Sequence, residues 1–419
     1  MKVIRLLLVG LMVLNFTTYK ACPVMAAPAP QEKSQKPLPT PEVVGAAAVL
    51  IDSVTGQILY AKNENQQMYP ASTTKILTTL LGLEKGGLTD RVTIGPDPVR
   101  VGGSSVYLQE GETLTLEELL YSAMLNSAND ATVAIAEHIG GSVENFAQMM
   151  NAKAKSLGAV NSHFNNPNGL PDTYHYTTAH DLALIAKAAM ENPKFREIVA
   201  SKTKDISRTP ADALTRLINH NKLLWNYEGA NGIKTGYTVV AQQCLVGSAQ
   251  RGDKEYIAVV LGSVGKSIWQ DVRHLLDYGF DNFQLVELTK ANQMIKTITV
   301  KNSDQVIQAV TAYGRSYSVP VGTTVKPTAR VQLLPNLQAP VNKGTKVGTL
   351  IYSAEGQEIG RVDLVAANSI TLKKSVVAPI VWSTAGGILL LTVGMMVAAT
   401  VSRSRRRKLR KRRALLKEY

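Results

Sequence analysis

The sequence predicts an α+β domain, then a small all-β domain and a C-terminal transmembrane helix. Strand-like runs flank a long stretch of helical periodicity within residues 42–286, which is typical of an antiparallel sheet with an attached helical cluster. Short alternating runs separated by Gly, Pro and Asn occupy residues 287–373 and indicate β structure alone. Residues 375–402 hold no charged side chain and are long enough to cross a bilayer as a tilted helix.

The elements of the α+β domain follow from local patterns. Residues 44–62 form a predicted hairpin, because two strand-like runs flank a turn at 53–56. Thr178, three residues before Asp181, is typical of a helix N-cap. Helical periodicity covers residues 72–84, 115–125, 129–139, 143–157, 178–191 and 193–200. Strands are then expected at 232–239, 242–250 and 255–263, and a helix at 267–283.

The two ends of the chain indicate export and anchoring. Residues 1–26 contain two basic residues near the start, then an apolar run and then small residues typical of a cleavage site. This pattern predicts a signal peptide. Residues 27–41 are a Pro-rich, flexible lead-in. The basic tail at 403–419 is expected to stay in the cytoplasm. A single-pass protein of the cell membrane, with its catalytic domain outside the cell, is therefore expected.

The net charge is explained by these ends. Of the formal net charge of +14, nine charges lie in residues 403–419 and three in residues 1–26, which leaves +2 for the exported part. The basic composition therefore gives no argument for nucleic-acid binding. One of the two cysteines, Cys22, falls in the signal peptide, so Cys244 has no partner for an intrachain disulfide.

Ser72 and Lys75 are the first candidates for chemistry. They lie in PASTTKIL, where a loop passes into an apolar helix, and residues three apart share a helix face. The free N–H groups at a helix start favour developing negative charge, as an acyl-transfer nucleophile needs. The chain holds two other S-x-x-K matches, at Ser201 and Ser263, so this spacing alone is weak. The six histidines form no metal-like pair, and no cofactor is expected.

Two further motifs strengthen the case. Ser127 and Asn129 form the one S-x-N of the chain, and Lys234-Thr235-Gly236 is its one K-T-G. Each has an ordinary structural explanation, as a helix boundary or as a strand that carries a lysine. In the order Ser72, Ser127, Lys234, however, the set is characteristic of penicillin-binding proteins and related β-lactamases.

With these motifs, the sequence resembles the low-molecular-weight penicillin-binding proteins, the serine-type D-alanyl-D-alanine carboxypeptidases. The matching stretches are PASTTKIL, MLNSANDA, NPNGLPD, NGIKTGYT and LLDYGFDNF. The resemblance implies a transpeptidase/β-lactamase-like fold with a five-stranded antiparallel sheet. It also implies peptidoglycan stem peptides that end in D-Ala-D-Ala as substrates, and covalent inhibition by β-lactams.

The resemblance also implies the catalytic roles. Ser72 attacks the carbonyl of the penultimate D-Ala, and Lys75 takes the serine proton while nearby Lys234 suppresses its charge. Ser127 passes a proton to the leaving amine, and Asn129 holds the substrate amide and orients Lys75.

The K-T-G strand is expected to bind the substrate. Lys234 and Thr235 hold the terminal carboxylate, and Gly236 lets the strand approach the acyl group. The backbone N–H groups of Ser72 and Tyr237 form the oxyanion hole.

Rival interpretations remain open at this point. A β-lactamase needs a glutamate before K-T-G, but the one E-x-x-N, at Glu228, directly precedes that strand. A D,D-endopeptidase that cleaves peptidoglycan cross-links would share every motif. A catalytically inert, membrane-tethered wall adaptor is disfavoured by the intact motif residues. The all-β domain is expected to be a spacer or docking module.

Overall fold

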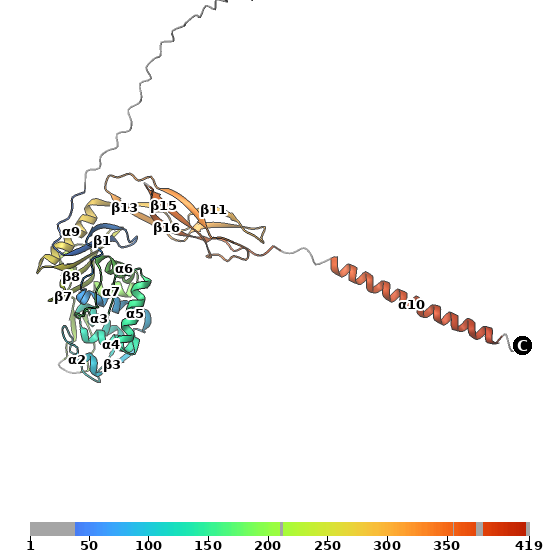
Figure 1. The fold of residues 1–419 in the computed structure, drawn as a ribbon, viewed down its shortest axis with the longest axis horizontal. Coiled ribbons are helices and arrows are strands. Elements are labelled where there is room, and N and C mark those ends of the chain that lie inside the picture. The colour runs from blue at the N-terminus through green and yellow to red at the C-terminus, as the bar shows by residue number, and fades with distance from the viewer. Residues whose placement is uncertain (1–37, 210–212, 355, 374–379, 416–419) are drawn as a thin grey trace, which may run out of the picture. The chain divides into compact units, whose positions relative to one another are not determined.

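The computed structural model describes residues 38–209, 213–354, 356–373 and 380–415. The predicted signal peptide and most of the Pro-rich lead-in lie outside the described residues. The described chain begins its regular structure with an antiparallel five-stranded sheet of order β2-β1-β9-β8-β7 (Figure 1). Its strands are β1 (Ala47–Asp52), β2 (Ile58–Lys62), β7 (Ala230–Thr238), β8 (Gln242–Arg251) and β9 (Lys254–Ser263).

The sheet is assembled from both ends of the domain, as predicted. β1 pairs antiparallel with β9, and Val49 lies opposite Val259. The N-terminal hairpin is thereby joined to three strands that follow about 170 residues later in the chain. The K-T-G strand β7 is an edge strand of this sheet. One side of its backbone therefore has no neighbouring strand within the sheet, and an extended substrate could pair with it.

Both faces of the central strands are covered. Side chains alternate between the faces of a strand, and Val49 and Ile51 join the core formed with the helical cluster. Leu50 points to the other face, where a Cβ on Gly279 of α9 (Ser267–Asn282) would lie 3.1 Å from it. All six residues of β1 are therefore buried, which explains its continuous apolar sequence.

The helical cluster packs against one face of the sheet (Figure 1). The predicted helices are confirmed to within a few residues, except that the first begins as a 3-10 turn. Thr115 and Glu118 form a reciprocal capping box, and the Thr178 side chain accepts from the Asp181 N–H as predicted. The elements are η1 (Ala71–Thr74), α1 (Lys75–Lys85), α2 (Pro96–Arg100), α3 (Leu116–Leu125), α4 (Asn129–Gly140), α5 (Val143–Ser156), α6 (Ala179–Met190), α7 (Pro193–Ala200) and α8 (Leu223–Asn226).

Four short strands were not predicted from the sequence. They form two antiparallel pairs beside the helical cluster, and each strand has three residues, too few for a periodic signal. They are β3 (Arg91–Thr93), β4 (Thr113–Thr115), β5 (Thr203–Asp205) and β6 (Arg216–Ile218).

The described residues between 283 and 373 form strands and no helix, and they have a hydrophobic core of their own. One sheet has the order β11-β12-β16-β15-β14, and β10 pairs with β13. Val347, Val362 and Leu364 of the larger sheet are fully buried. The strands are β10 (Phe283–Thr289), β11 (Met294–Thr299), β12 (Val306–Thr311), β13 (Arg315–Pro320), β14 (Thr328–Leu333), β15 (Lys346–Ala354) and β16 (Gln357–Ala366).

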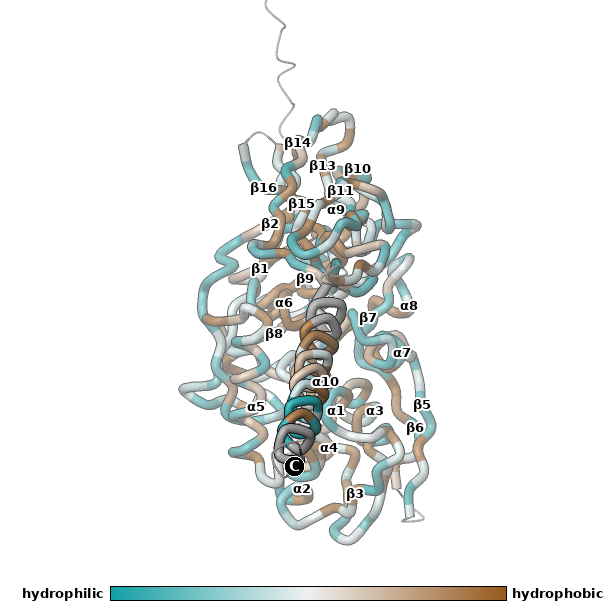
Figure 2. The backbone as a smooth tube through the Cα atoms, turned by 90° about the vertical axis from the view of Figure 1, so that its right-hand side faces the viewer, coloured by the Kyte–Doolittle hydropathy of each residue, from teal (hydrophilic) through white to brown (hydrophobic). Residues whose placement is uncertain are grey.

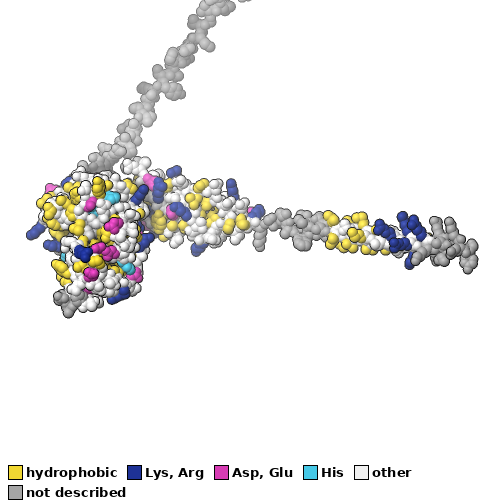
Figure 3. Space-filling model, turned by 60° about the horizontal axis from the view of Figure 1, so that its bottom comes forward, with side chains coloured by type: hydrophobic (Ala, Val, Ile, Leu, Met, Phe, Trp, Pro, Cys, Tyr) yellow, Lys and Arg dark blue, Asp and Glu magenta, His cyan; other side chains and the backbone are white. Residues whose placement is uncertain are grey.

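The last element, α10 (Ile380–Leu415), joins an apolar stretch to a basic one (Figures 2 and 3). Its residues Ile388–Arg410 are long and apolar enough to cross a membrane. The predicted transmembrane helix ends at residue 402, but α10 continues into the basic tail as far as Leu415. Arg and Lys are good helix formers, so nothing at the apolar boundary ends the helix.

Candidate active site

Ser72 and Lys75 come together where η1 passes into α1. The Lys75 Nζ donates to the Ser72 Oγ at 3.0 Å, because the two residues lie on consecutive positions of one helical face. Ala71, just before the serine, has φ +48°, a left-handed conformation that is uncommon for a residue with a side chain. This strained residue immediately precedes the candidate nucleophile and so sets its direction.

Lys75 is enclosed by the helical cluster. It is 0 % exposed, and its Nζ also donates to Asn129 Oδ1 and to the Asn168 carbonyl, both at 2.7 Å. Burial, and then the charge of Lys234, hold the Lys75 pKa well below its usual range. An amine with a lowered pKa and a serine hydroxyl in reach is equipped to act as a base.

The S-x-N motif lies between α3 and α4, where the helical run is interrupted as predicted. Ser127 has φ +59° and is buried, and Asn129 is the first residue of α4. The Asn129 Oδ1 accepts from Lys75, which agrees with the predicted orienting role. Its Nδ2, however, donates to the Gly102 carbonyl at 2.7 Å, a contact that the sequence did not indicate.

The K-T-G strand lies against the nucleophile. A Cβ on Gly236 would lie 3.0 Å from the Ser72 backbone nitrogen and 3.1 Å from that of Thr73. Only a glycine permits this approach. Thr235 is partly buried and Tyr237 is exposed, so the strand presents both residues at the surface of the site.

Lys234 is the second buried amine. It is 1 % exposed, its Nζ donates to the Thr235 carbonyl at 3.0 Å, and burial lowers its pKa to about 7. Two buried amines with lowered pKa values therefore lie close enough for the charge of Lys234 to act on Lys75, which contacts the Ser72 hydroxyl. Structural lysines rarely adopt this arrangement, and it marks the cluster as a candidate active site.

The loop before α3 is fastened by two carboxylates. Asp130 accepts from the Leu108 N–H at 3.0 Å and from the Ser105 hydroxyl, and so ties this loop to the S-x-N helix. Asp130 is not the N-cap of α4, because Ala128 occupies that position and the Asp130 carboxylate faces the loop.

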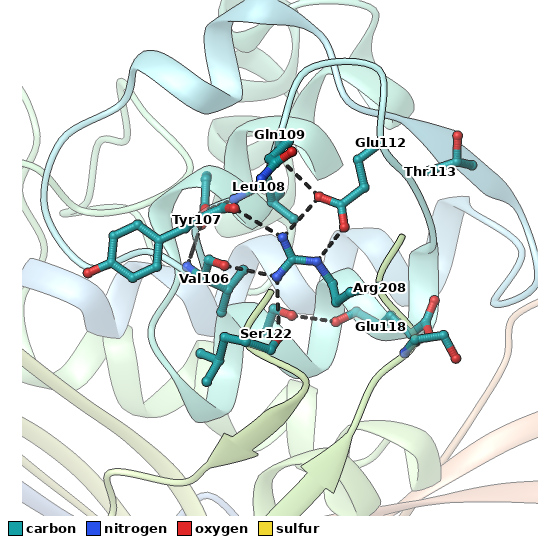
Figure 4. A network of polar contacts seen from close by, with 12 residues as sticks. Val106, Tyr107, Leu108, Gln109, Glu112, Thr113, Glu118, Ser122 and Arg208 are labelled. Atoms are coloured by element: carbon teal, nitrogen blue, oxygen red, sulfur yellow. Dashed lines mark hydrogen bonds and ion pairs between the residues drawn. The ribbon is translucent and has the colours of Figure 1, made fainter. Parts of the chain in front are cut away.

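The second carboxylate belongs to a buried ion pair. Arg208 contacts Glu112 with two nitrogens, and both side chains are almost completely buried (Figure 4). The same guanidinium donates to the carbonyls of Val106 at 2.9 Å and Tyr107 at 3.0 Å. It thereby holds the backbone of residues 106–107, and no sequence signal linked Arg208 to Glu112, 96 positions away.

The NPNGL segment supplies a contact as well as a turn. The Asn168 carbonyl accepts from Lys75, and the Pro167 carbonyl accepts from the Thr78 hydroxyl at 2.6 Å. Gly169 has φ +88°, and a Cβ there would lie 1.8 Å from the Ala71 carbonyl oxygen. By composition this segment is a turn, but its carbonyl contact to Lys75 has no signal in the sequence, because every residue carries a backbone acceptor.

Comparison with known families agrees with this geometry. A family model for D-alanyl-D-alanine carboxypeptidases matches residues 31–265, more than half of the chain. The chain belongs to the D-alanyl-D-alanine carboxypeptidase family. A second model, for the C-terminal domain of penicillin-binding protein 5, matches residues 283–372. The resemblance inferred from the three motifs is confirmed, and so is the expectation of a serine-type carboxypeptidase.

Individual members of this carboxypeptidase family are similar over most of their length. D-alanyl-D-alanine carboxypeptidase DacF of Bacillus subtilis is 36 % identical over 87 % of this chain and 93 % of its own length. DacC of Escherichia coli is 32 % identical over 80 % of this chain and 87 % of its own length. The crystal structure of penicillin-binding protein 5 from Haemophilus influenzae aligns with TM-score 0.67 and 30 % identity, over 80 % of this chain and all of that chain.

A basic residue after the last sheet strand could hold a substrate carboxylate, and Lys266 and Arg273 are the two that follow β9 most closely. Lys266 lies at the N-cap of α9, and Arg273 donates to the Asn226 carbonyl at 3.1 Å. Lys234 and Thr235 therefore remain the candidates for this contact.

Proposed function

We propose that the chain removes the terminal D-alanine from peptidoglycan stem pentapeptides through an acyl-enzyme on Ser72. The observation that carries this proposal is the 3.0 Å contact between Ser72 Oγ and the Nζ of Lys75, a fully buried amine with a lowered pKa. A neutral amine at this distance can accept the serine proton as the hydroxyl attacks.

Acylation begins when Lys75 takes the proton of Ser72, and the serine oxygen bonds to the carbonyl carbon of the penultimate D-Ala. The negative charge on the carbonyl oxygen is stabilised by the backbone N–H groups of Ser72 and Tyr237. The close packing of Gly236 against the Ser72 nitrogen supports this arrangement, since it leaves the strand adjacent to the nucleophile.

The leaving D-alanine is held and protonated by the remaining motif residues. Lys234 and Thr235 bind its carboxylate, which raises the pKa of Lys234 and keeps this lysine charged. Ser127 passes a proton to the leaving amine as the C–N bond breaks. Asn129 keeps Lys75 in line through its Oδ1.

Water then attacks the acyl carbon and releases the shortened peptide. The sequence lacks a glutamate at the position that class A β-lactamases use for this step. β-Lactams are therefore expected to acylate Ser72 and to be released slowly.

A fluorescent penicillin tests the nucleophile. The full chain, in detergent, should be labelled covalently, and Ser72→Ala should not. Ser201→Ala is the matched control, because Ser201 heads a second S-x-x-K with its hydroxyl bonded to the Glu197 carbonyl. Labelling that persists in Ser72→Ala would refute the assignment.

Two substrates separate the carboxypeptidase from a D,D-endopeptidase. Release of D-alanine from a pentapeptide, without cleavage of cross-linked dimers, is the expected result. The reverse preference would assign the same residues to cross-link cleavage, and an inert wall adaptor would process neither substrate.

For the chain as a whole we propose the organisation expected from the sequence. A signal peptide (1–26) and a lead-in (27–41) precede the catalytic domain (42–286), the all-β domain (287–373), a membrane span (375–402) and a cytoplasmic tail (403–419). The C-terminal apolar helix is compatible with a membrane anchor. Protease added outside intact cells should degrade the catalytic domain and leave a protected fragment that contains the basic tail. Degradation of the basic tail in this experiment would contradict the proposed orientation.

A further inference from the structure

His175 is a buried titratable side chain that the proposed mechanism does not use. It is 1 % exposed and lies just before α6, in a segment that approaches the end of η1. The ring packs edge-on against Phe164, with ring centroids 5.5 Å apart. A buried imidazole needs partners for both ring nitrogens.

The hydrogen bonds of His175 determine which nitrogen carries the proton. The Asn165 backbone N–H donates to Nδ1 at 3.1 Å, so Nδ1 is an acceptor. In a neutral ring the other nitrogen, Nε2, is then protonated, and it donates to the Thr74 hydroxyl oxygen at 2.9 Å. The Thr74 hydroxyl in turn donates to the Ala71 carbonyl at 2.9 Å.

This chain of hydrogen bonds involves the residue before each member of the candidate catalytic pair. Ala71 immediately precedes Ser72, and Thr74 immediately precedes Lys75. Ala71 holds φ +48°, a conformation that persists only where its surroundings enforce it. The bond from Thr74 to the Ala71 carbonyl is one such constraint, and His175 fixes the direction of the Thr74 hydroxyl.

We propose that His175 is a positioning residue, which holds the Ala71–Thr74 turn through Thr74 and so aims Ser72 at Lys75. The inference rests on the proposed role of Ser72 as nucleophile.

Burial of the His175 ring favours the neutral form that this role requires. Burial, and the positive charges of His163 and Lys75, lower the His175 pKa to about 4 against the opposing effect of Asp172. A protonated ring would place an N–H on Nδ1 against the Asn165 N–H. The hydrogen bonds from Asn165 to His175 and from His175 to Thr74 are therefore intact at neutral pH and are lost as the pH falls below about 4.

Two substitutions at His175 distinguish the roles of its two ring nitrogens. In His175→Gln the amide nitrogen reaches the Nε2 position and keeps a donor for Thr74. In His175→Asn the amide reaches only the Nδ1 position, and Thr74 loses its donor. We expect His175→Asn to lower the rate of acylation by a fluorescent penicillin roughly ten- to hundredfold, and His175→Gln to retain more of it.

Thr74→Val supplies an independent test, because valine keeps the shape of threonine but cannot bond to Ala71. Its acylation rate should match that of His175→Asn, and the double variant should lose no more than either alone. In the release of D-alanine, kcat should fall while KM stays unchanged, since neither residue touches substrate. Thr74→Ser restores the hydroxyl and should recover the rate.

The control is His163→Asn, a half-buried histidine whose Nδ1 lies 2.7 Å from the Tyr174 carbonyl, and its rate should equal that of the wild type. Equal losses in His175→Asn and His175→Gln, or additive losses in the double variant, would overturn the proposal. If the wild type is labelled by penicillin and Ser72→Ala is not, then the assignment of Ser72 as the nucleophile holds, whatever the His175 variants show. Labelling of Ser72→Ala refutes the proposed function itself.

Discussion

Gly236 of the K-T-G strand lies so close to Ser72 that a Cβ on the glycine would sit 3.0 Å from the serine backbone nitrogen. This contact joins an edge strand to the turn that carries the nucleophile, although the two residues are 164 positions apart in the sequence. The contact places the Ser72 backbone N–H, proposed as an oxyanion-hole donor, next to the strand proposed to bind substrate.

Gly236→Ala should impair acylation more than folding. The new methyl group displaces the Ser72 N–H, and loss of one oxyanion donor costs roughly a hundred- to thousandfold in rate. Penicillin acylation kinetics and the melting temperature measure the two effects. Gly95→Ala is the control, because a Cβ there makes only an ordinary 3.5 Å contact with Glu137. An unchanged acylation rate in Gly236→Ala would show that the strand does not approach the acyl group.

The pH dependence of kcat/KM should be bell-shaped. Lys75 acts as a base only when neutral, and its pKa is lowered, so activity rises as the pH increases through that value. Lys234 binds carboxylate only when charged, and its pKa is about 7, so activity falls as the pH rises beyond about 7. The two limbs belong to the coupled pair.

Measuring D-alanine release between about pH 5 and pH 10 tests this profile. Lys234→Arg should move the alkaline limb upward, since an arginine stays charged throughout this range. An alkaline limb that stays in place in Lys234→Arg would remove Lys234 from carboxylate binding.

Asn129→Asp should disable the base. The substitution puts a carboxylate 2.7 Å from the Lys75 Nζ, where it favours the charged amine and raises the Lys75 pKa. Each unit of increase lowers the neutral fraction about tenfold, so acylation at pH 7 should drop by roughly a hundredfold and recover at higher pH. Asn145→Asp, on the exposed start of α5, is the control. An unshifted pH profile in Asn129→Asp would contradict the contact.

Arg208→Met should destabilise the domain strongly. It leaves Glu112 charged and buried without its partner, which typically costs about 3–5 kcal/mol. Urea unfolding monitored by fluorescence measures the loss. The double variant Arg208→Met with Glu112→Leu should recover much of it, because no unpaired charge remains.

The exposed pair of Arg216 and Asp205 provides the comparison for this ion pair. Its side chains are 67 % and 65 % exposed, so Arg216→Met should leave the unfolding midpoint unchanged. Equal destabilisation by both arginine substitutions would indicate that the burial of Arg208 does not matter for stability.

Local patterns were sufficient for most of the secondary structure. The helix from Ala179 to Met190 begins where Thr178 and Asp181 predicted a cap, because capping depends on side chains within one turn. The strand pairs β3–β4 and β5–β6 were missed, since three-residue strands are stabilised by contacts with the rest of the fold and carry no period of their own.

The sequence by itself determined the family and the groups proposed to carry the chemistry, because these groups are recognisable by type and order. They are Ser72, Lys75, Ser127, Asn129 and the K-T-G residues. Only the tertiary structure decided how these groups are supported. The Asn168 carbonyl on Lys75, the Arg208–Glu112 pair and the His175–Thr74 bond join residues far apart in the chain. Their physical reason is burial: once folding removes water from these polar groups, each must find its partner inside the protein.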